Sequence, residues 1–538
     1  MQESPMSRVL VNQLRFYYES PYLNLFEDVT LDIDTSWRTA LVGRNGRGKT
    51  TFLRLLQAEL PPSAGTIVAP ERLTRFPYAP ADTTGQVRAV VKESVAPFQA
   101  WEEEMDELLQ HDDEESLARY AKLQERYDAE GGYTIDARIE SELAALGLTP
   151  EELERSFDTL SEGQRTRALI AALFLRVDSW PLIDEPTNHL DAHGRDLLAT
   201  YLARQPGFLL VSHDRMLLDR SCDHVLSINK SDVRLTRGSF STWHEEMKRE
   251  EGWESQRKET LKREIRALDN AARKRRTWSA RKEKEKRGGG DKGRIGHLAA
   301  RQMKRALSAE QRGEKRIEEK RELLKNAEKE RPLRLRPERS GREGGRPLLV
   351  VEDVAVGRGE HPVLHGLSFE IAAGERIALV GPNGCGKTTL LATIAGELSP
   401  HTGVVRLPPR HTVVRALQTP LWSEGLLHTH LLAAEIDEPL FRTTMGSLDL
   451  SGEIFDRPLE TFSQGERKKV ELCRSLLHPA HLYLWDEPLN YVDLFAREAI
   501  EEAILEEQPT MLFVEHDCRF IERVATRVID LGALAPGP

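Results

Sequence analysis

The chain has 538 residues, of which 39% are hydrophobic and 30% charged, and this composition excludes wholesale disorder. Its length predicts three or four domains, and its formal net charge of −11, taken alone, argues against a nucleic-acid partner. No apolar run approaches the ~18 residues that a membrane-spanning helix needs. The first residues, MQESPMSRVL, lack the apolar core of a signal peptide, and four scattered cysteines without a CxxC pair favour a reducing cytosol.

The first motif in chain order is the run ALVGRNGRGKTTFLRLL, Ala40–Leu56, between a strand-like and a helix-like segment. It contains the pattern G-x-x-x-x-G-K-[ST], in which glycines let backbone N–H groups surround phosphate oxygens. We expect Lys49 to contact the β- and γ-phosphates and Thr50 to bind Mg²⁺. The alternative is a glycine-rich turn without a ligand. The other expected ATP-binding residues of this loop are Gly43, Asn45, Gly46, Gly48 and Thr51.

An acidic, helix-like stretch follows within residues 88–145. Lys49 lies 135 positions before Asp184, whereas the matching pair later in the chain, Lys387 and Asp486, is 99 positions apart. The first half of the chain therefore carries about 36 extra residues. We predict that they form a helical arm inserted within residues 88–145.

A helix-opening segment, LSEGQ, begins at Leu160 and precedes the apolar run PLIDEPTNHLD. Asp184 ends this strand, where its carboxylate can hold Mg²⁺, often through water. Glu185 follows where an attacking water must be polarised, so we expect it to act as general base. His213, after the next apolar strand, is expected to contact the γ-phosphate and orient that water. The alternatives are a solvated Asp–Glu pair and a structural histidine.

Between Lys248 and Ser340 the composition changes sharply, to 32 Lys+Arg against 17 Asp+Glu. The rest of the chain holds 44 basic and 70 acidic residues. Apolar spacing and the glycine cluster Gly288–Gly290 predict a hairpin of two long helices. We therefore predict a first domain over residues 1–243, a basic helical linker over 244–340 and a second domain over 341–538.

The tip of this linker, residues 271–305, has 14 Lys+Arg and 3 Asp+Glu. Such an excess fits contact with a phosphate backbone, and Trp278 and His297 could stack on bases. The alternative, a charged helix with internal i,i+4 ion pairs, fits residues 306–330 better because charge signs alternate there. The expected RNA-binding residues are Arg273, Lys274, Arg275, Arg276, Trp278, Arg281, Lys282, Lys284, Lys286, Arg287, Lys292, Arg294, His297, Arg301, Lys304 and Arg305.

The second half repeats the first, with ALVGPNGCGKTTLLATI, LYLWDEPLNYVD and LFVEHDC in the same order. We expect Glu487 and His516 to be catalytic, and Thr388 and Asp486 to bind Mg²⁺. The repeat predicts an α/β fold of two tandem P-loop ATPase domains joined by the helical linker. The expected ATP-binding residues of the second loop are Gly381, Asn383, Gly384, Gly386, Lys387, Thr388 and Thr389.

LSEGQ and its counterpart FSQGE, with the two phosphate-binding loops, resemble the signature loops of ATP-binding-cassette (ABC) ATPases. The resemblance implies that two cassettes stack head to tail within one chain, each ATP lying between one phosphate loop and the other signature loop. Lys49 would then share a site with Ser463, and Lys387 with Ser161. The same resemblance implies that the loops Asn188–Asp191 and Asn490–Asp493 cross the interface. It also adds Ser161, Gly163, Gln164, Ser463 and Gly465 to the ATP-binding residues.

The two copies depart from the family pattern in different ways. Gln418 matches the glutamine that contacts Mg²⁺ in the family, whereas the first copy has FPYAP at this place. Tyr18 is expected to stack on adenine in the first cassette, and the matching stretch of the second has no aromatic residue. Glu466 replaces the usual glutamine of the second signature loop. We therefore expect two chemically unequal ATP sites.

Two cassettes, a charged helical linker and the linker entry RGSFSTW resemble the ABC-F group. The linker tip, GRNGRGKTTF and WDEPLNYVD resemble members that protect ribosomes from lincosamides, streptogramin A and pleuromutilins. The resemblance implies a cytoplasmic, monomeric ATPase that uses ATP and Mg²⁺. It also implies binding at the exit site of the bacterial ribosome, near the P-site tRNA and 23S rRNA.

Three other functions stay open from the sequence. A general translation factor of the same group would share every motif but have no role with drugs. The ATPase subunit of a membrane transporter would have no evident use for the basic linker. A DNA-repair or chromosome-organising ATPase usually carries zinc modules or far longer coiled coils, and neither is visible in the sequence.

Overall fold

The protein is described from a computed structural model. It describes residues 8–19, 22–111, 113–229, 232–250, 252–253, 260, 263, 333, 335–338, 347–357, 362–409, 411–448, 450 and 452–532. The chain divides into two compact units, one of Met1–Ser241 with Arg331–Pro538 and one of Thr242–Glu330. The first unit therefore contains both cassettes. All sixteen residues expected to bind RNA, from Arg273 to Arg305, lie outside the described residues.

The centre of the first cassette is a six-stranded sheet in the order β5-β6-β7-β3-β8-β9. Neighbouring strands pair in parallel, except for the antiparallel pair β8 and β9. The middle strands are apolar and buried along their length, as expected for parallel strands covered by helices on both faces. The strand bounds are β5 Leu73–Phe76, β6 Trp180–Asp184, β7 Phe208–Val211, β3 Arg38–Val42, β8 His224–Ile228 and β9 Val233–Arg237.

A smaller antiparallel sheet, β2-β1-β4, packs on the same core through alternate residues of its long strands. Its strands are β1 Arg8–Glu19, β2 Tyr22–Asp34 and β4 Ala64–Val68. Side chains that point inward, such as Val9, Val11 and Leu14, are buried, while their neighbours face solvent. The helices of this cassette are α1 Lys49–Leu56, α2 Val87–Val95, α3 Phe98–Leu108, α4 Glu114–Ala129, α5 Ile135–Ala145, α6 Pro150–Leu153, α7 Glu162–Leu175, α8 Ala192–Leu202 and α9 Arg215–Ser221.

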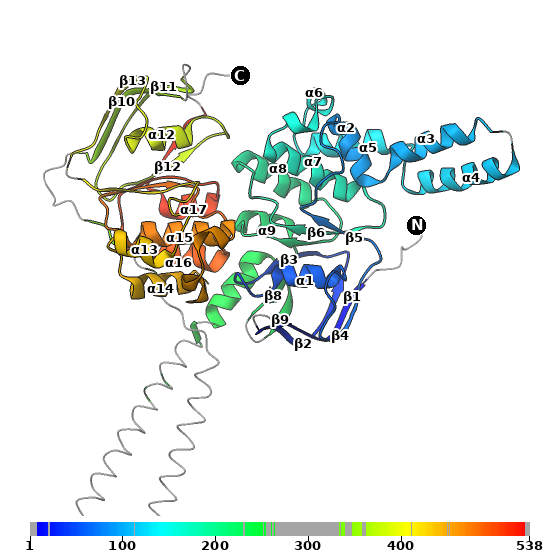
Figure 1. Cartoon of the computed structure of the whole chain (residues 1–538), viewed down its shortest axis with the longest axis horizontal. Coiled ribbons are helices and arrows are strands. Elements are labelled where there is room, and N and C mark those ends of the chain that lie inside the picture. Colours follow the sequence, from blue (N-terminus) through cyan, green and yellow to red (C-terminus); the bar gives the residue numbers. More distant parts are fainter. Residues whose placement is uncertain are drawn as a thin grey trace, which may run out of the picture. The chain divides into compact units, whose positions relative to one another are not determined.

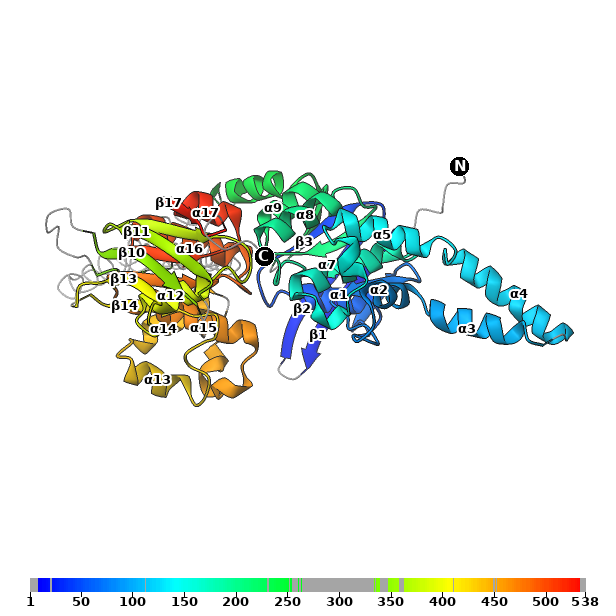
Figure 2. The same ribbon diagram turned by 90° about the horizontal axis from the view of Figure 1, so that it is seen from above.

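The predicted arm region, residues 88–145, contains two kinds of helix. α2 and α5 pack against α7, whereas α3 and α4 lie side by side and extend away from them in both ribbon views (Figures 1 and 2). The pair is joined by Tyr127, whose hydroxyl donates to Glu102 at 2.6 Å and whose ring meets Phe98 edge-on. α3 and α4 have no counterpart among the described residues of the second cassette, and both lie within residues 88–145.

The second cassette repeats this architecture with a five-stranded parallel sheet, β14-β15-β16-β12-β17, and a three-stranded antiparallel sheet, β11-β10-β13. The predicted α/β fold with two ATPase domains is therefore confirmed. The strands are β14 Val413–Ala416, β15 Leu482–Asp486, β16 Met511–Val514, β12 Arg376–Val380, β17 Arg527–Asp530, β10 Leu349–Val356, β11 Leu364–Ile371 and β13 Thr402–Arg406. The helices are α12 Lys387–Ile394, α13 Leu427–Ala433, α14 Glu438–Ser447, α15 Gln464–Leu477, α16 Leu494–Glu507 and α17 Cys518–Val524.

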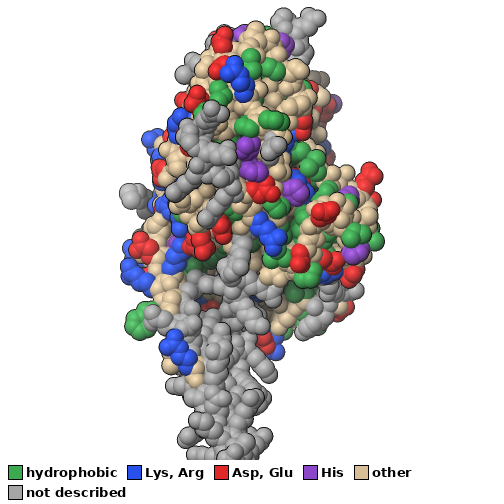
Figure 3. All heavy atoms as spheres, turned by 90° about the vertical axis from the view of Figure 1, so that its left-hand side faces the viewer, with side chains coloured by type: hydrophobic (Ala, Val, Ile, Leu, Met, Phe, Trp, Pro, Cys, Tyr) green, Lys and Arg blue, Asp and Glu red, His purple; other side chains and the backbone are tan. Residues whose placement is uncertain are grey.

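Two further observations concern the surface charge and the helix lengths of the described residues. Acidic and basic side chains are interspersed, and not gathered by sign, on the described part of the face drawn in Figure 3. None of the described helices is both long enough and apolar enough to cross a membrane. The strong basic excess counted in the sequence lies in the linker, most of which is outside the described residues.

Candidate nucleotide sites

Each phosphate loop connects an inner strand of its sheet to a helix, β3 to α1 and β12 to α12. Gly48 and Gly386, directly before these helices, have φ of 95° and 99°, which favours glycine. Neither caps its helix with a side chain, so the first N–H groups stay available for phosphate oxygens. The local backbone is therefore that of an anion-binding turn in both copies.

The lysine of each loop is buried and folds back over the loop that carries it. Lys49 Nζ donates to Gly43 O at 2.6 Å, and Lys387 Nζ donates to Gly381 O at 2.8 Å and to Pro382 O at 2.9 Å. Burial lowers the pKa of Lys49, and the opposing charges of Asp493, Glu185 and Asp184 raise it in part. The ammonium thus lies at the centre of the turn, where it can exchange carbonyl partners for phosphate oxygens.

The expected general bases follow the ends of β6 and β15 in a rarely populated backbone conformation. Glu185 has φ of 51° and Glu487 has φ of 48°. In each copy the glutamate N–H donates to the neighbouring strand, to Val211 O at 2.9 Å or to Val514 O at 3.0 Å. Strained backbone of this kind, held in place by a sheet, is common at functional sites.

The predicted histidines meet these glutamates in both cassettes. His213 Nε2 lies 3.3 Å from Glu185 Oε1, and His516 Nε2 lies 3.2 Å from Glu487 Oε1. Burial, reinforced by Asp184, raises the pKa of Glu185 above its usual range. Burial would also raise the pKa of Glu487, but hydrogen bonds from His516 and Asn490 and the charge of His516 outweigh it and hold that pKa at about 2. The two sites therefore differ electrostatically around the same pair.

The residues expected to hold Mg²⁺ are arranged differently in the two cassettes. In the second, burial raises the pKa of Asp486 and the nearby Thr388 hydroxyl lowers it in part, and Gln418 lies two residues past β14, the strand beside β15. These oxygen donors fit Mg²⁺. In the first, Asp184 Oδ2 accepts from Arg75 Nη2 at 2.9 Å. Asp184, the expected Mg²⁺ ligand of the first site, is therefore already engaged in an ion pair with Arg75.

Both signature loops form the same helix cap. Ser161 Oγ accepts from Gln164 N at 3.2 Å, and Gln164 Oε1 accepts from Ser161 N at 2.9 Å. In the second cassette Ser463 Oγ and Glu466 Oε2 make the same reciprocal pair, at 3.2 and 2.7 Å. Glu466 thus replaces the usual glutamine without loss of the cap. The expected sharing of ATP between Lys49 and Ser463, and between Lys387 and Ser161, stays a prediction.

The loop Asn490–Asp493 meets the first phosphate loop. Asn45 N donates to Asp493 Oδ2 at 3.1 Å, and Asn45 Nδ2 donates to Tyr491 O at 3.2 Å. Asp493 also caps its own helix by accepting from Ala496 N at 2.9 Å, as the matching Asp191 of the first cassette does from Gly194 N at 2.8 Å. Tyr18, expected to stack on adenine, lies beside α1, with its hydroxyl 3.2 Å from Thr51 Oγ1.

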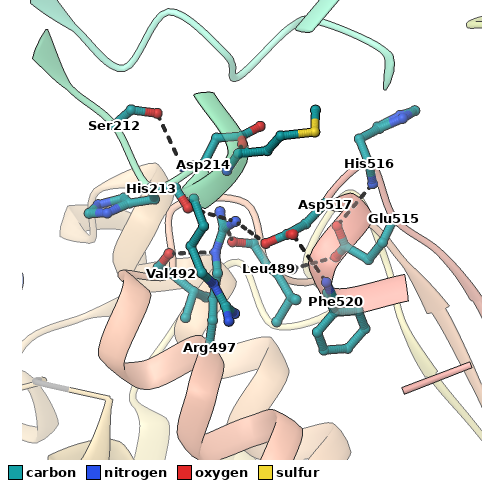
Figure 4. Close-up of polar contacts among 12 residues, drawn as sticks. Ser212, His213, Asp214, Leu489, Val492, Arg497, Glu515, His516, Asp517 and Phe520 are labelled. Atoms are coloured by element: carbon teal, nitrogen blue, oxygen red, sulfur yellow. Dashed lines mark hydrogen bonds and ion pairs between the residues drawn. The ribbon is translucent and has the colours of Figure 1, made fainter. Parts of the chain in front are cut away.

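Two buried arginines were missed by the reasoning from sequence. Arg497 donates to Val492 O at 2.9 Å, to Asp517 Oδ2 at 3.2 Å and, across the interface, to His213 O at 3.2 Å (Figure 4). Its counterpart Arg195 donates to a loop carbonyl and to an aspartate of its own cassette. A signal existed, because both copies read D-x-x-x-R at this place.

The ABC transporter family matches residues 26–188 and 364–490. The chain belongs to this family. It is 30% identical over 567 residues to the tylosin resistance ATP-binding protein TlrC of Streptomyces fradiae, covering 99% of this chain and 98% of that protein. It is 28% identical to ABC transporter F family member 5 of Arabidopsis thaliana, covering 98% and 75% of the two chains. The chain is therefore an ABC-F ATPase, and it hydrolyses ATP.

The fold also resembles that of a solved ATPase. The archaeal ribosome recycling factor aABCE1, solved in complex with the ribosomal stalk protein aP1, superposes with a TM-score of 0.59. The match covers 96% of this chain and 87% of that one at 20% sequence identity, so it supports the tandem-cassette fold alone.

Proposed function

We propose that this ABC-F ATPase works in the cytoplasm, as a monomer, on the bacterial ribosome. With ATP bound, the cassettes close and the chain docks at the exit site, beside the P-site tRNA. The linker then reaches toward the peptidyl-transferase centre and contacts 23S rRNA through its basic tip. The observation that carries this proposal is the excess of 14 Lys+Arg over 3 Asp+Glu in residues 271–305, between two acidic cassettes.

The nucleotide chemistry follows from the residues that meet at the carboxyl edge of each sheet. The glycine turn and its lysine hold the phosphates, and Glu185 and Glu487 accept the proton of the attacking water. His213 and His516, whose Nε2 atoms lie 3.3 and 3.2 Å from these carboxylates, contact the γ-phosphate and orient the water. Thr388, Asp486 and Gln418 would hold Mg²⁺ in the second site, and Thr50 and Asp184 in the first. When bound, Mg²⁺ neutralises charge on the phosphate oxygens.

Hydrolysis would release the chain by opening the interface. Asn45 of the first phosphate loop is hydrogen-bonded directly to Asp493 and Tyr491 of the second cassette. A shift of this loop after hydrolysis would therefore act directly on the contact between the cassettes. The ATP state is therefore the ribosome-bound state in this proposal.

A double variant tests the ribosome-bound state. Glu185→Gln with Glu487→Gln keeps ATP binding but removes both bases, so the chain should accumulate in the ribosome fraction when ATP is present. The matched control, Lys49→Ala with Lys387→Ala, should stay in the supernatant because ATP cannot close the cassettes. A glutamine variant that sediments no more than this control would refute the proposal.

The role of the ribosome complex is proposed to be protection from antibiotics. Support comes from the similarity to TlrC, a tylosin resistance protein, over nearly the whole of both chains. Drug displacement would be direct or would act through rRNA and tRNA. Deletion of the gene should raise susceptibility to macrolides such as tylosin, or to lincosamides, streptogramin A or pleuromutilins.

A general translation factor is the second candidate, favoured by the similarity to F family member 5 of Arabidopsis thaliana, whose name carries no resistance role. Under this alternative, the deletion strain would keep its susceptibility to every drug class but change its rate of protein synthesis.

A further inference from the structure

An arginine occupies the same place beside the Mg²⁺-binding aspartate in both cassettes. Arg75 in β5 pairs with Leu182 of β6, two residues before Asp184. Arg415 in β14 pairs with Leu484 of β15, two residues before Asp486. The strand register therefore makes the two arginines equivalent, although the flanking sequences differ.

These equivalent arginines have different partners. Arg75 binds Asp184 at 2.9 Å, in a pair whose side chains are only 20% and 13% exposed. Arg415 forms its ion pair with Glu397 instead, and Thr388 lies near Asp486. One cassette thus has its metal ligand engaged by a guanidinium, and the other has it beside the threonine of the phosphate loop.

The two arginines take different partners because of residues in and just after the helix that follows each phosphate loop. Glu59 and Glu397 are equivalent, since each donates its N–H to the residue five positions earlier, Arg54 O at 2.9 Å or Ala392 O at 3.0 Å. In the first cassette, Arg54 Nε binds Glu59 at 3.1 Å. In the second, an alanine stands at that position, so Glu397 is available to Arg415.

The two sites also differ at the position of Gln418. Phe76 pairs with Ile183 and Ala416 pairs with Trp485, so Tyr78 occupies the place of Gln418. The Tyr78 hydroxyl donates to Leu169 O at 3.2 Å, on α7. The first site therefore has a tyrosine, directed at a helix carbonyl, where the second offers an amide oxygen.

We propose that Arg75 sets the divalent-cation requirement of the first ATP site by competing with Mg²⁺ for Asp184. The guanidinium must leave Asp184 before a cation can bind this carboxylate, whereas Arg415, whose charge also reaches Asp486, forms its ion pair with Glu397. The two ATP sites accordingly load Mg²⁺ at different free concentrations. This inference rests on the proposed nucleotide sites and deepens them.

Metal binding itself provides the test, with Mn²⁺ as a paramagnetic substitute for Mg²⁺. The full chain with Lys387→Ala, loaded with a non-hydrolysable ATP analogue, reports the first site by electron paramagnetic resonance. Arg75→Gln removes the competitor, and Arg54→Ala frees Glu59 to draw Arg75 away. Each should lower the free Mn²⁺ concentration at half occupancy by roughly three- to tenfold, the value of a partly buried ion pair.

A mirrored pair of glutamate variants tests the same competition at both sites. In a Lys49→Ala chain, Glu397→Gln should release Arg415 toward Asp486 and raise the Mn²⁺ midpoint of the second site by a similar factor. The matched control, Glu59→Gln in the Lys387→Ala chain, should leave the first site unchanged, because Arg75 already binds Asp184.

The outcomes separate this inference from the proposed sites. An unchanged midpoint for both Arg75→Gln and Arg54→Ala would overturn the inference, and the second variant keeps the test valid if the first fails to fold, because Arg54 is substantially exposed. If a chain with both Lys49→Ala and Lys387→Ala bound Mn²⁺–nucleotide as well as the unaltered chain, the nucleotide sites themselves would be wrong.

Discussion

Arg497 provides the sharpest test of how the cassettes contact each other. Its guanidinium, 8% exposed, pairs with the 3% exposed Asp517 and also donates to carbonyls at Leu489, Val492 and His213. Arg497→Lys keeps a charge opposite Asp517 but cannot make all of these hydrogen bonds, because a lysine ammonium lacks the planar fork. The contact with His213 O joins the two cassettes, so its loss should weaken closure.

The magnitude follows from the nature of this hydrogen bond. A charged donor to a buried carbonyl is worth about 1.5–3 kcal/mol, equal to roughly a 10- to 150-fold change in the closure equilibrium. In a chain with Glu185→Gln and Glu487→Gln, fluorescence energy transfer between dyes on the two cassettes would report closure. The ATP concentration at half closure should rise at least about tenfold.

Arg195→Lys is the matched control for this variant. Arg195 makes equivalent bonds within its own cassette, to Leu190 O at 3.1 Å and to Asp214 at 3.2 Å. Arg195→Lys should therefore change the ATP concentration at half closure less than about threefold, a smaller change than the loss of one charged hydrogen bond would cause. Equal shifts for the two lysine variants, with both chains folded, would refute the assignment of the His213 contact to closure.

Two further predictions concern stability. Burial raises the pKa of Glu515 to about 7, although Arg497 opposes the shift. Between about pH 4.5 and 7 the folded chain then binds more protons at Glu515 than the unfolded chain, so the free energy of unfolding falls as the pH rises through that window, by about 3 kcal/mol at most. Glu515→Gln should flatten this dependence of the unfolding free energy on pH in urea unfolding, and an unchanged slope would contradict the reasoning. Ser463→Ala should cost about 1 kcal/mol through loss of the α15 cap, whereas Glu466→Gln should stay within about 0.5 kcal/mol, as measured by the same unfolding assay. A Ser463→Ala chain as stable as the unaltered chain would contradict this contribution of the cap.

Local features of the nucleotide sites could be predicted because a few neighbouring residues determine them. The glycine turns, the helix after each lysine and the serine caps depend on backbone geometry within about a single turn of chain. That the histidines and the glutamates lie at the same edge of each sheet could be predicted for another reason. Strand ends of a parallel sheet lie on one edge, and the two copies repeat the same spacing.

The extent of the arm needed the structure. Acidic helical character continues through residues 88–145, so sequence alone does not separate the helices that cover α7 from those that extend beyond it. The buried side chains distinguish the two kinds of helix, because α4 has a single buried side chain, Tyr127, whereas Ile135, Ile139 and Leu143 of α5 are all buried. Helices that share a composition can therefore differ in position.

The sequence by itself determined the repeated cassettes, the phosphate loops, the expected chemistry of the Asp–Glu pairs and the inequality of the two sites. Tertiary structure alone decided which partner each charged group takes. Arg75 and Arg415 occupy equivalent strand positions, yet one binds Asp184 and the other Glu397. Arg215, in turn, pairs across the interface with Glu501, where the second copy has Cys518 at the equivalent place. Such choices depend on competition among side chains distant in sequence, which only the folded chain brings within reach of one another.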